Sequence, residues 1–218
     1  MSTSILNNQA GVEPLYPKSI NLDSPFLTHA KTICTISQAA QEYINQKTFP
    51  CSVRKGDLLV RAGDTSQNIY FLRRGVMRSY VREGIKDITT WIAGEYEFVA
   101  CITCLGLDQP ARENLQALED SELSGLRFDD LQYLYDHFPE MNVVGRKILE
   151  KYFRDSEERA YIARLTEATS KYKYFSTTKS DLLNRVPLKF VASYLGMTLE
   201  TLSRIRSKLS RNANGIPS

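Results

Sequence analysis

The apolar and polar positions along the chain fall into segments with different periodicity. Residues 1–25 are polar and include three prolines, which indicates a loose N-terminal arm. Residues 26–47 carry apolar side chains at helical spacing. Short β-prone runs follow up to about Arg127, and helical periodicity then returns over residues 128–135, 139–154 and 157–175. The pattern predicts an α+β protein in which strands are followed by helices.

The strand-rich region predicts a small antiparallel barrel or jelly roll. Its runs are short and end in glycine-bearing turns at roughly 8–12-residue spacing, as in β-rolls. They read LLVRAG, IYFLRRG, VMRSYVREG, DITTWIAG, EYEFVAC, LQALED and ELSGLRF. We expect this roll and its flanking helices to form one domain over residues 26–138.

Two short amphipathic helices with a tight turn between them are predicted within residues 186–209. Their apolar faces are spaced as helical stripes, Leu188, Val191, Ala192 and Leu195 in the first helix and Leu202, Ile205 and Leu209 in the second. Pro187 suits a first helical position, Gly196 a left-handed cap, and Thr198 an N-cap. This plan predicts a helix-turn-helix, whose second helix enters the DNA major groove.

The polar face of the second helix carries side chains suited to reading DNA. Arginine can donate two hydrogen bonds to a guanine, and a glutamate can accept one from a cytosine amino group. An ordinary helical hairpin with a solvated charged face is the alternative interpretation. The residues that project away from the apolar stripe are Glu200, Thr201, Ser203 and Arg204, with Arg206 and Lys208 within a further turn.

The distribution of charge favours the DNA-binding interpretation. The whole chain has a net charge of only +3, but residues 171–218 contain nine basic and two acidic side chains. That segment is therefore +7, and the other 170 residues are −4. A basic C-terminal unit on a mildly acidic body is expected where one part contacts the phosphate backbone.

Composition and motifs argue against the other classes. No apolar run approaches the roughly 18 residues of a membrane span, and the N-terminus lacks the pattern of a secretory signal, so we expect a cytoplasmic protein without membrane contact. A jelly-roll enzyme would need clustered histidine and carboxylate metal ligands. His29 and His137 lie outside the predicted strands, so we expect neither catalysis nor a metal site. A sensing or protein-binding module without DNA recognition would leave the basic segment unexplained.

The four cysteines leave more than one interpretation open. Cys101 and Cys104 form a C-x-x-C pair that could be half of a metal site, a redox pair or part of an iron–sulfur site, with Cys34 and Cys51 as distant partners. Buried free thiols are common core residues, and we favour that structural role.

Two stretches of this sequence resemble the Crp/Fnr family, the dimeric transcription factors that include the bacterial cyclic-AMP receptor protein and the fumarate–nitrate regulators. The first is RKGDLLVRAGDTSQNIYFLRRGVMRSYV, with glycines at turn positions 56, 63 and 75, and the second is LLNRVPLKFVASYLGMTLETLSRIRSKL. The resemblance covers about residues 49–209. It implies a cyclic-nucleotide-binding-like jelly roll, a dimerisation helix over 139–155, a hinge near Asp155 and a winged-helix-like domain over 156–218.

The resemblance also implies a homodimer on a palindromic operator. Val144, Ile148, Leu149 and Tyr152 are the apolar residues that the dimer seam could use. Members that carry an iron–sulfur cluster keep a tight cysteine cluster in an N-terminal segment, and this chain has none there. RNA polymerase is the expected further partner.

The nucleotide pocket that the resemblance implies is degenerate. Cyclic-AMP binders carry a Gly-Glu pair and then an Arg-Ser or Arg-Thr pair around the cyclic phosphate, and the second pair here reads Arg112-Glu113. The first falls near Ala100-Cys101. A carboxylate where phosphate belongs adds repulsion and desolvation, so Arg112 and Glu113 are expected to form a surface loop or an ion pair. We therefore expect no cofactor and no control by cyclic AMP in the usual mode; a protein whose DNA binding depends on another small ligand is the alternative.

Matching ETLSR to the family gives each residue of the second helix a role. The E-x-x-S-R arrangement resembles the fumarate–nitrate branch and implies a TTGA-like half-site. Arg204 is matched to a guanine, Glu200 to a cytosine or adenine amino group, and Ser203 to a base edge. Leu199 can touch a thymine methyl group. The residues expected to hold phosphates are Thr198, Lys189, Arg206 and Lys208.

Overall fold

The computed structural model describes residues 23–213, which form helices around a β-roll. Two helices, α1 (Pro25–Ile33) and α2 (Gln38–Lys47), precede the roll. Its strands are β1 (Phe49–Val53), β2 (Leu58–Val60), β3 (Asn68–Arg74), β4 (Met77–Glu83), β5 (Lys86–Ala93), β6 (Phe98–Val99), β7 (Asn114–Ala117) and β8 (Ser121–Arg127). The following helices are α3 (Phe128–His137), α4 (Pro139–Arg164), α5 (Ala168–Thr178), the 3₁₀ turn η1 (Ser180–Leu182), α6 (Leu188–Tyr194) and α7 (Leu199–Ala213).

The roll is built from two four-stranded antiparallel sheets. One has the strand order β1-β8-β3-β6 and the other the order β2-β7-β4-β5. Strands distant in sequence are therefore neighbours, as expected for a jelly roll. The predicted α+β class and the antiparallel roll are confirmed.

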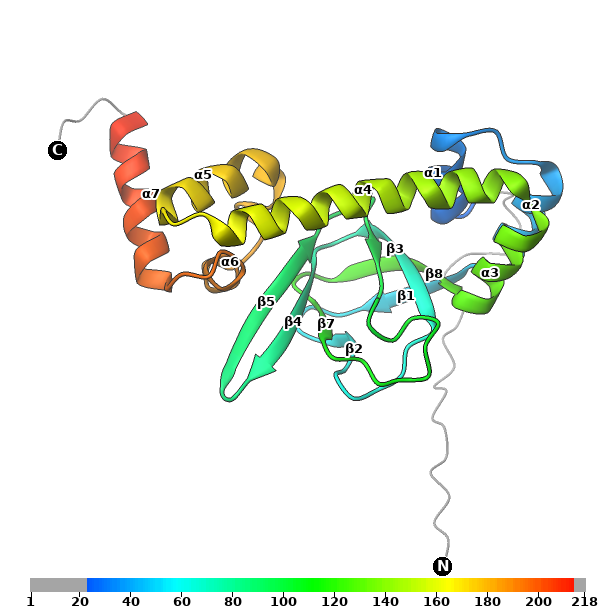
Figure 1. The fold of residues 1–218 in the computed structure, drawn as a ribbon, viewed down its shortest axis with the longest axis horizontal. Helices are drawn as coiled ribbons and strands as arrows, with labels where there is room; N and C mark the ends of the chain where they lie inside the picture. Colours follow the sequence, from blue (N-terminus) through cyan, green and yellow to red (C-terminus); the bar gives the residue numbers. More distant parts are fainter. Residues whose placement is uncertain (1–22, 214–218) are drawn as a thin grey trace, which may run out of the picture.

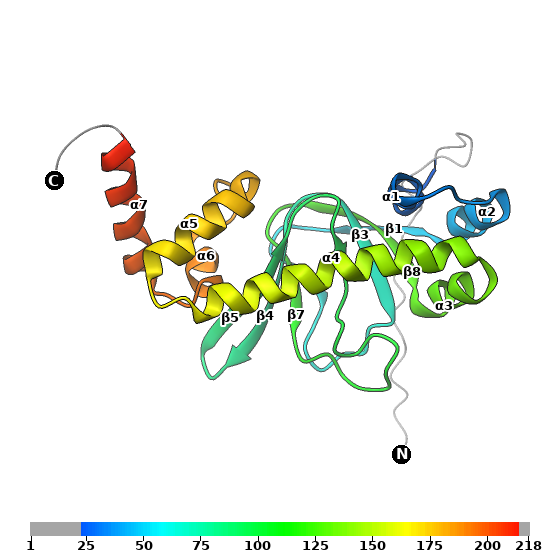
Figure 2. The same cartoon turned by 45° about the horizontal axis from the view of Figure 1, so that its top comes forward.

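The long helix α4 crosses the roll and joins the two ends of the molecule. Figure 1 shows α1, α2 and α3 at one end of α4 and α5, α6 and α7 at the other, and Figure 2 shows the same order from a second direction. The helix was expected to end near Asp155, but it continues without a break to Arg164. Residues 155–164 contain neither glycine nor proline, and Ile162 in this stretch is buried against the C-terminal helices.

Three groups of buried apolar side chains hold the fold together. One lies between α1, α2, α3, α4 and the neighbouring strands, and a second fills the interior of the roll. The third contains the apolar faces of α5, α6 and α7 together with Val76, Ile92 and Leu118 of the roll. The C-terminal helices therefore share a core with the roll, and burial of apolar surface stabilises that junction.

The expected N-terminal arm and the C-terminal wing are compared here with residues 23–213. Of the expected N-terminal arm only residues 23–25 are described, and the Ser24 hydroxyl there accepts a hydrogen bond from the Leu27 N–H at the start of α1. From residue 165 to residue 213 the described chain forms helices and turns, and no wing strands occur within that range. None of the helices described is both long enough and apolar enough to cross a membrane.

Candidate DNA-binding helices and effector pocket

Helices α6 and α7 meet through a tight turn whose geometry is set by glycine. Gly196 has φ +64°, a left-handed conformation that other residues adopt only with strain. The N–H of Met197 donates to the carbonyl of Ala192 at 3.0 Å, which closes a Schellman-type end of α6. The Thr198 hydroxyl then accepts a hydrogen bond from the Thr201 N–H at 3.2 Å. The predicted glycine cap and threonine N-cap are both present, whereas Pro187 precedes the first helical residue instead of occupying it.

The apolar stripes of these two helices face inward as the spacing predicted. Val191, Ala192 and Leu195 of the α6 segment are buried, and so are Leu202 and Ile205 of α7. Leu188 and Leu209 are half-buried at the margins of the same core. Burial of this stripe fixes which face of α7 remains in solvent.

The outward face of α7 presents the predicted polar set to solvent. Glu200, Ser203, Arg204 and Lys208 are exposed, whereas Thr201 and Arg206 are half-buried. Leu199 is exposed at the start of α7, and Lys189 is exposed on α6. Among the described residues, no carboxylate forms an ion pair with any cation of this face, which comprises Lys189, Arg204, Arg206 and Lys208. These cations are therefore available to phosphate or base edges.

Two basic residues of the C-terminal segment serve a different purpose. The Lys179 ammonium lies 2.7 Å from Glu97, and the Arg185 guanidinium lies 2.6 Å from Glu95 and 2.7 Å from Glu119. The carboxylates belong to turns of the roll that are 66 to 90 residues away from these cations in the chain. Both cations were counted in the +7 charge attributed to DNA binding, because the sequence alone does not show which cations form ion pairs with carboxylates.

The residues expected at the nucleotide pocket do not form a phosphate cradle. Arg112 is exposed and makes no ion pair with the described residues, while Glu113 is half-buried and accepts a hydrogen bond from the Ser79 hydroxyl. Ala100 and Cys101 are buried in the roll. The surface loop expected at Arg112 is present, but Glu113 pairs with Ser79 instead of with Arg112.

The sequence of this chain is similar to that of a known domain family and of known proteins. Residues 50–138 match the family described as the cyclic nucleotide-binding domain. The fumarate and nitrate reduction regulatory protein of Vibrio cholerae is 24% identical over 174 residues, which cover 73% of this chain and 68% of that protein. These similarities to a cyclic nucleotide-binding domain and to fumarate and nitrate regulators support a transcriptional regulator of the Crp/Fnr type.

Two solved structures share the fold of this chain. FixK2 from Bradyrhizobium japonicum superposes with a TM-score of 0.63 at 17% identity, covering 76% of this chain and 86% of FixK2. CLP from Xanthomonas campestris, described as a c-di-GMP-responsive global regulator, superposes with a TM-score of 0.61 at 18% identity. The match to CLP covers 81% of this chain and 93% of CLP.

The outward stripe of α4 differs from the predicted dimer seam. Val144 is buried, and Ile148 and Tyr152 pack against the core beneath the helix, so these three do not face solvent. Leu149 and Phe153 do, with 69% and 68% of their surface exposed. Together with Tyr135, Asn142 and Arg146 they line a groove of about 490 Å³. Of the four residues predicted for the seam, only Leu149 lies on the outward stripe, because helical periodicity does not reveal which stripe the roll occupies.

A larger cleft lies between the roll, α4 and the C-terminal helices of this regulator. Its volume is about 840 Å³. Glu113 and Ala100 line one part, and Lys179 and Tyr194 line the part next to the C-terminal helices. The Oγ1 atom of Thr90, which also lines the cleft, is buried without a hydrogen-bond partner among the described residues. The remaining lining is mainly apolar and aromatic, including Trp91, Phe98, Tyr152 and Phe153.

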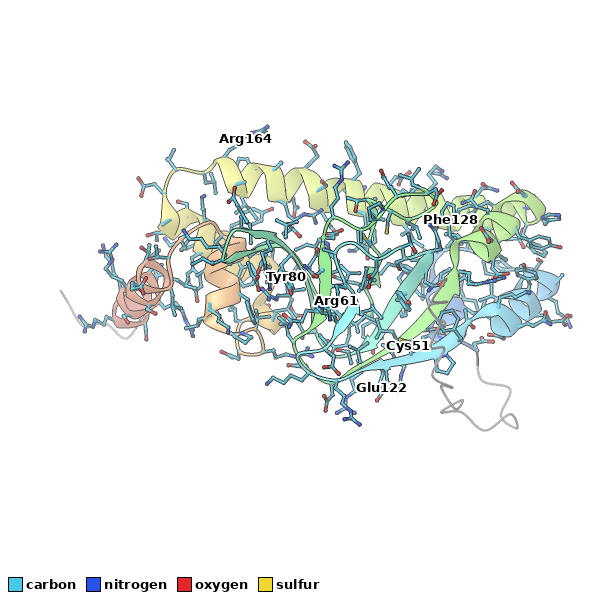
Figure 3. All side chains as sticks on the ribbon, turned by 90° about the horizontal axis from the view of Figure 1, so that it is seen from below. Cys51, Arg61, Tyr80, Glu122, Phe128 and Arg164 are labelled. Atoms are coloured by element: carbon cyan, nitrogen blue, oxygen red, sulfur yellow. The ribbon has the colours of Figure 1, made fainter. Side chains whose placement is uncertain are left out.

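Two of the four cysteines are buried, and both histidines lie against aromatic rings. Cys101 and Cys104 are 1% and 0% exposed, and burial raises the pKa of the Cys104 thiol, which disfavours the reactive thiolate. All four thiols are free, and Figure 3 shows Cys51 on the roll. His29 packs against the rings of Phe71 and Phe98, and His137 stacks on Tyr133. No group of three or more metal-ligating side chains occurs within the described part of the chain.

Proposed function

We propose that this protein is a sequence-specific DNA-binding regulator that binds a palindromic operator as a homodimer. The observation that carries the proposal is the exposed face of α7, where Glu200, Ser203 and Arg204 stand in solvent above a fully packed helix-turn-helix core. Such a face fits the major groove, and its neighbouring cations fit the phosphates on either side.

Within that face we assign base contacts to three residues. Arg204 pairs with a guanine, Glu200 accepts from a cytosine or adenine amino group, and Ser203 contacts an adjacent base edge of a TTGA-like half-site. Leu199, with 42% of its surface exposed, touches a thymine methyl group. Lys189, Arg206 and Lys208 hold phosphates. Thr201 and Thr198 are joined by a hydrogen bond between their hydroxyl groups at 3.1 Å, so we assign Thr198 to the start of the helix in place of a phosphate contact.

The second copy of the chain is assigned to the outward stripe of α4. Asn142, Arg146, Leu149 and Phe153 follow the alternating spacing of four and three residues that brings side chains to one helix seam. An isologous pairing along this seam covers two large apolar side chains that the single chain leaves exposed. RNA polymerase and a cytoplasmic location belong to the same proposal.

The experiment that tests DNA binding and assembly uses the full chain with duplex DNA. Sedimentation on a palindromic TTGA-containing duplex should give two chains per duplex, with half-site centres about 34–36 Å apart. Binding to random duplex should weaken as salt rises, since phosphate contacts release counterions. A monomer both free and on the palindrome, or binding without a salt slope, contradicts the proposal. Leu149→Glu should prevent dimer formation, while Ile85→Glu, at the exposed hairpin tip, should not.

Cyclic AMP is not the effector in this proposal. By the resemblance, Glu113 stands where a phosphate-binding hydroxyl is expected; its carboxylate accepts a hydrogen bond from Ser79, and Arg112 is exposed. Millimolar cyclic AMP should change neither the melting temperature nor the affinity for DNA. A ligand at about 100 times its dissociation constant would add roughly 2.7 kcal/mol of stability, which a melting curve detects. A saturable shift that Arg112→Ala abolishes would overturn this part of the proposal.

A small ligand other than cyclic AMP is the second candidate for control. The specific observation in its favour is the cleft of about 840 Å³ that contacts both the roll and the C-terminal helices, because a ligand there would touch both parts. Melting curves with cyclic GMP, c-di-GMP and haem test this candidate. Shifts with none of the three leave regulation by protein abundance as the simplest account.

A further inference from the structure

The C-terminal helices are fixed to the roll by a guanidinium held between two carboxylates. Arg185 lies in the loop between η1 and α6. Its Nη1 and Nη2 atoms donate to the two oxygens of Glu95 at 2.8 and 2.6 Å. Its Nε and Nη2 atoms donate to the two oxygens of Glu119 at 3.1 and 2.7 Å. Paired, charge-assisted hydrogen bonds of this kind fix direction as well as distance, because the guanidinium is planar. We call Arg185, Glu95 and Glu119 the interdomain clamp.

The roll side of the interdomain clamp is rigid. Glu95 also accepts the N–H of Gly75 at 2.9 Å, and Gly75 turns with φ +106° against Ser121, whose Cα would lie only 2.8 Å from an added Cβ. The turns that follow β5 and β7 therefore contact the guanidinium directly, and the turn that follows β3 supports Glu95 through Gly75. Beneath them Val76 and Leu118 share a core with Leu182 and Val186 of the C-terminal unit.

A second contact fixes α6 to the β4–β5 hairpin. The Ser193 hydroxyl accepts the N–H of Thr89 at 2.9 Å and donates to the carbonyl of Asp87 at 3.0 Å. Arg78, only 2% exposed, lies with its guanidinium carbon 3.7 Å from the ring centroid of Phe190 on α6 and 4.1 Å from that of Tyr80. Figure 3 shows Tyr80 within this part of the roll. Since α6 packs on α7, both contacts constrain the direction of the recognition helix.

We propose that the interdomain clamp determines which spacing between operator half-sites the dimer accepts. The inference rests on the proposed function, because it concerns two recognition helices related by a two-fold axis through α4. Each α7 is held to its own roll by the clamp, and each roll is held to α4. The distance and angle between the two α7 helices are therefore fixed before DNA is bound. A change of one base pair in the spacer moves one half-site both along and around the duplex, and a rigid pair cannot follow.

The test compares affinities for a spacer series with the affinity for a single half-site. The duplexes carry the same two half-sites, with the spacer at its best length or changed by one or two base pairs. Wild-type protein should lose about tenfold or more when the spacer changes by one base pair, since simultaneous engagement is lost. In the double variant Glu95→Gln/Glu119→Gln and in Arg185→Gln, the loss of affinity caused by the same spacer change should be no more than about threefold. The affinity of both variants for a single half-site, relative to random DNA, should stay unchanged.

The matched control is Glu122→Gln, which removes one carboxylate from the same roll. Glu122 pairs with Arg73 and Arg74, and among the described residues no hydrogen bond or ion pair joins its side chain to the C-terminal helices. Figure 3 shows it at the outer face of the roll. This variant should keep the wild-type spacer ratio. Melting curves verify that each variant is folded, and Glu119→Gln alone, which leaves both Glu95 bonds in place, serves if the double variant unfolds.

The outcomes separate the two proposals. Clamp variants that are folded and keep the wild-type spacer ratio overturn the role of the clamp and leave the proposed function intact. A wild-type protein that binds a palindrome no better than a single half-site contradicts the proposed dimeric operator recognition, and the clamp inference then falls with it. If Glu122→Gln lowers the ratio of affinities between the best and the changed spacer as much as the clamp variants do, the role of the clamp is also overturned. A general loss of charge on the roll would then explain the effect.

Discussion

Helix α7 and the 100–113 segment of the roll are the two regions where binding residues were predicted, yet their polar residues have opposite surroundings. On α7, Arg204 and Glu200 are exposed to solvent, and Arg204 forms no ion pair with any described residue. In the roll, the Glu113 carboxylate accepts a hydrogen bond from the buried Ser79 hydroxyl, and Arg112 is exposed. Buried polar groups are normally hydrogen-bonded, and Glu113 and Ser79 meet this need within the protein, whereas the polar groups of α7 are in solvent. The contrast supports the proposal that α7 contacts DNA and that cyclic AMP is not bound in the usual mode.

The largest expected effect comes from the core beneath α7. Leu202 is fully buried between α6 and α7, so Leu202→Ala should lower the free energy of unfolding by about 2–5 kcal/mol through lost burial and a cavity. DNA binding should fall with it. Leu199→Ala removes a side chain of the same size that is 42% exposed, and it should leave the melting temperature close to wild type. Equal melting temperatures for both variants would contradict the assigned packing of α7.

Removal of one arginine from each region gives a direct comparison. Arg204→Ala should weaken operator binding by about 1–3 kcal/mol and relax one position of the sites selected from a random library. Arg112→Ala removes the same charge from an exposed position of the roll, and operator affinity should stay within about twofold of wild type. Unchanged selected sites for Arg204→Ala would refute its assignment to a base edge.

The hydrogen bond from Ser79 to Glu113 leads to a prediction about stability. Glu113→Ala removes the acceptor of the Ser79 hydroxyl, and Ser79 is 0% exposed. The unsatisfied hydroxyl should cost about 1–3 kcal/mol of unfolding free energy. Ser79→Ala combined with Glu113→Ala should recover part of that loss, because no buried donor is then left without an acceptor. Denaturant unfolding of the two variants measures the difference. A double variant less stable than Glu113→Ala would contradict the claim that Glu113 satisfies the buried Ser79 hydroxyl.

The smallest effect concerns acid. Hydrogen bonds from Arg185, aided by the Gly75 N–H, lower the pKa of Glu95 from 4.5 to about 2. A carboxylate with a lowered folded-state pKa stabilises the fold above its unfolded pKa and loses that contribution as pH falls toward the folded value. Between about pH 4.5 and pH 2, the stability of wild type should therefore fall more steeply than that of Glu95→Gln. Parallel unfolding curves over this range would show that Glu95 and Arg185 do not interact in solution.

Local sequence determined the helix-turn-helix, and the reason is that its signals act over a few residues. The apolar stripes, Gly196 and the Thr198 cap each depend on neighbours within one or two turns, and all lie where the spacing predicted. The antiparallel roll was also predictable, since its strands and turns alternate regularly along the chain. The assigned contacts of Arg204 and its neighbours with DNA stay predictions.

Tertiary structure alone decided which residues meet across the chain. Helical periodicity identified apolar positions in α4, but the roll covers Val144, Ile148 and Tyr152 and leaves Leu149 and Phe153 outward. Arg185 looked like one more DNA-facing cation until the fold brought it between Glu95 and Glu119. Charge and periodicity describe single segments, whereas ion pairs and buried faces are properties of two segments brought together by the whole fold. The sequence therefore determined the recognition element, and the tertiary structure determined how that element is held.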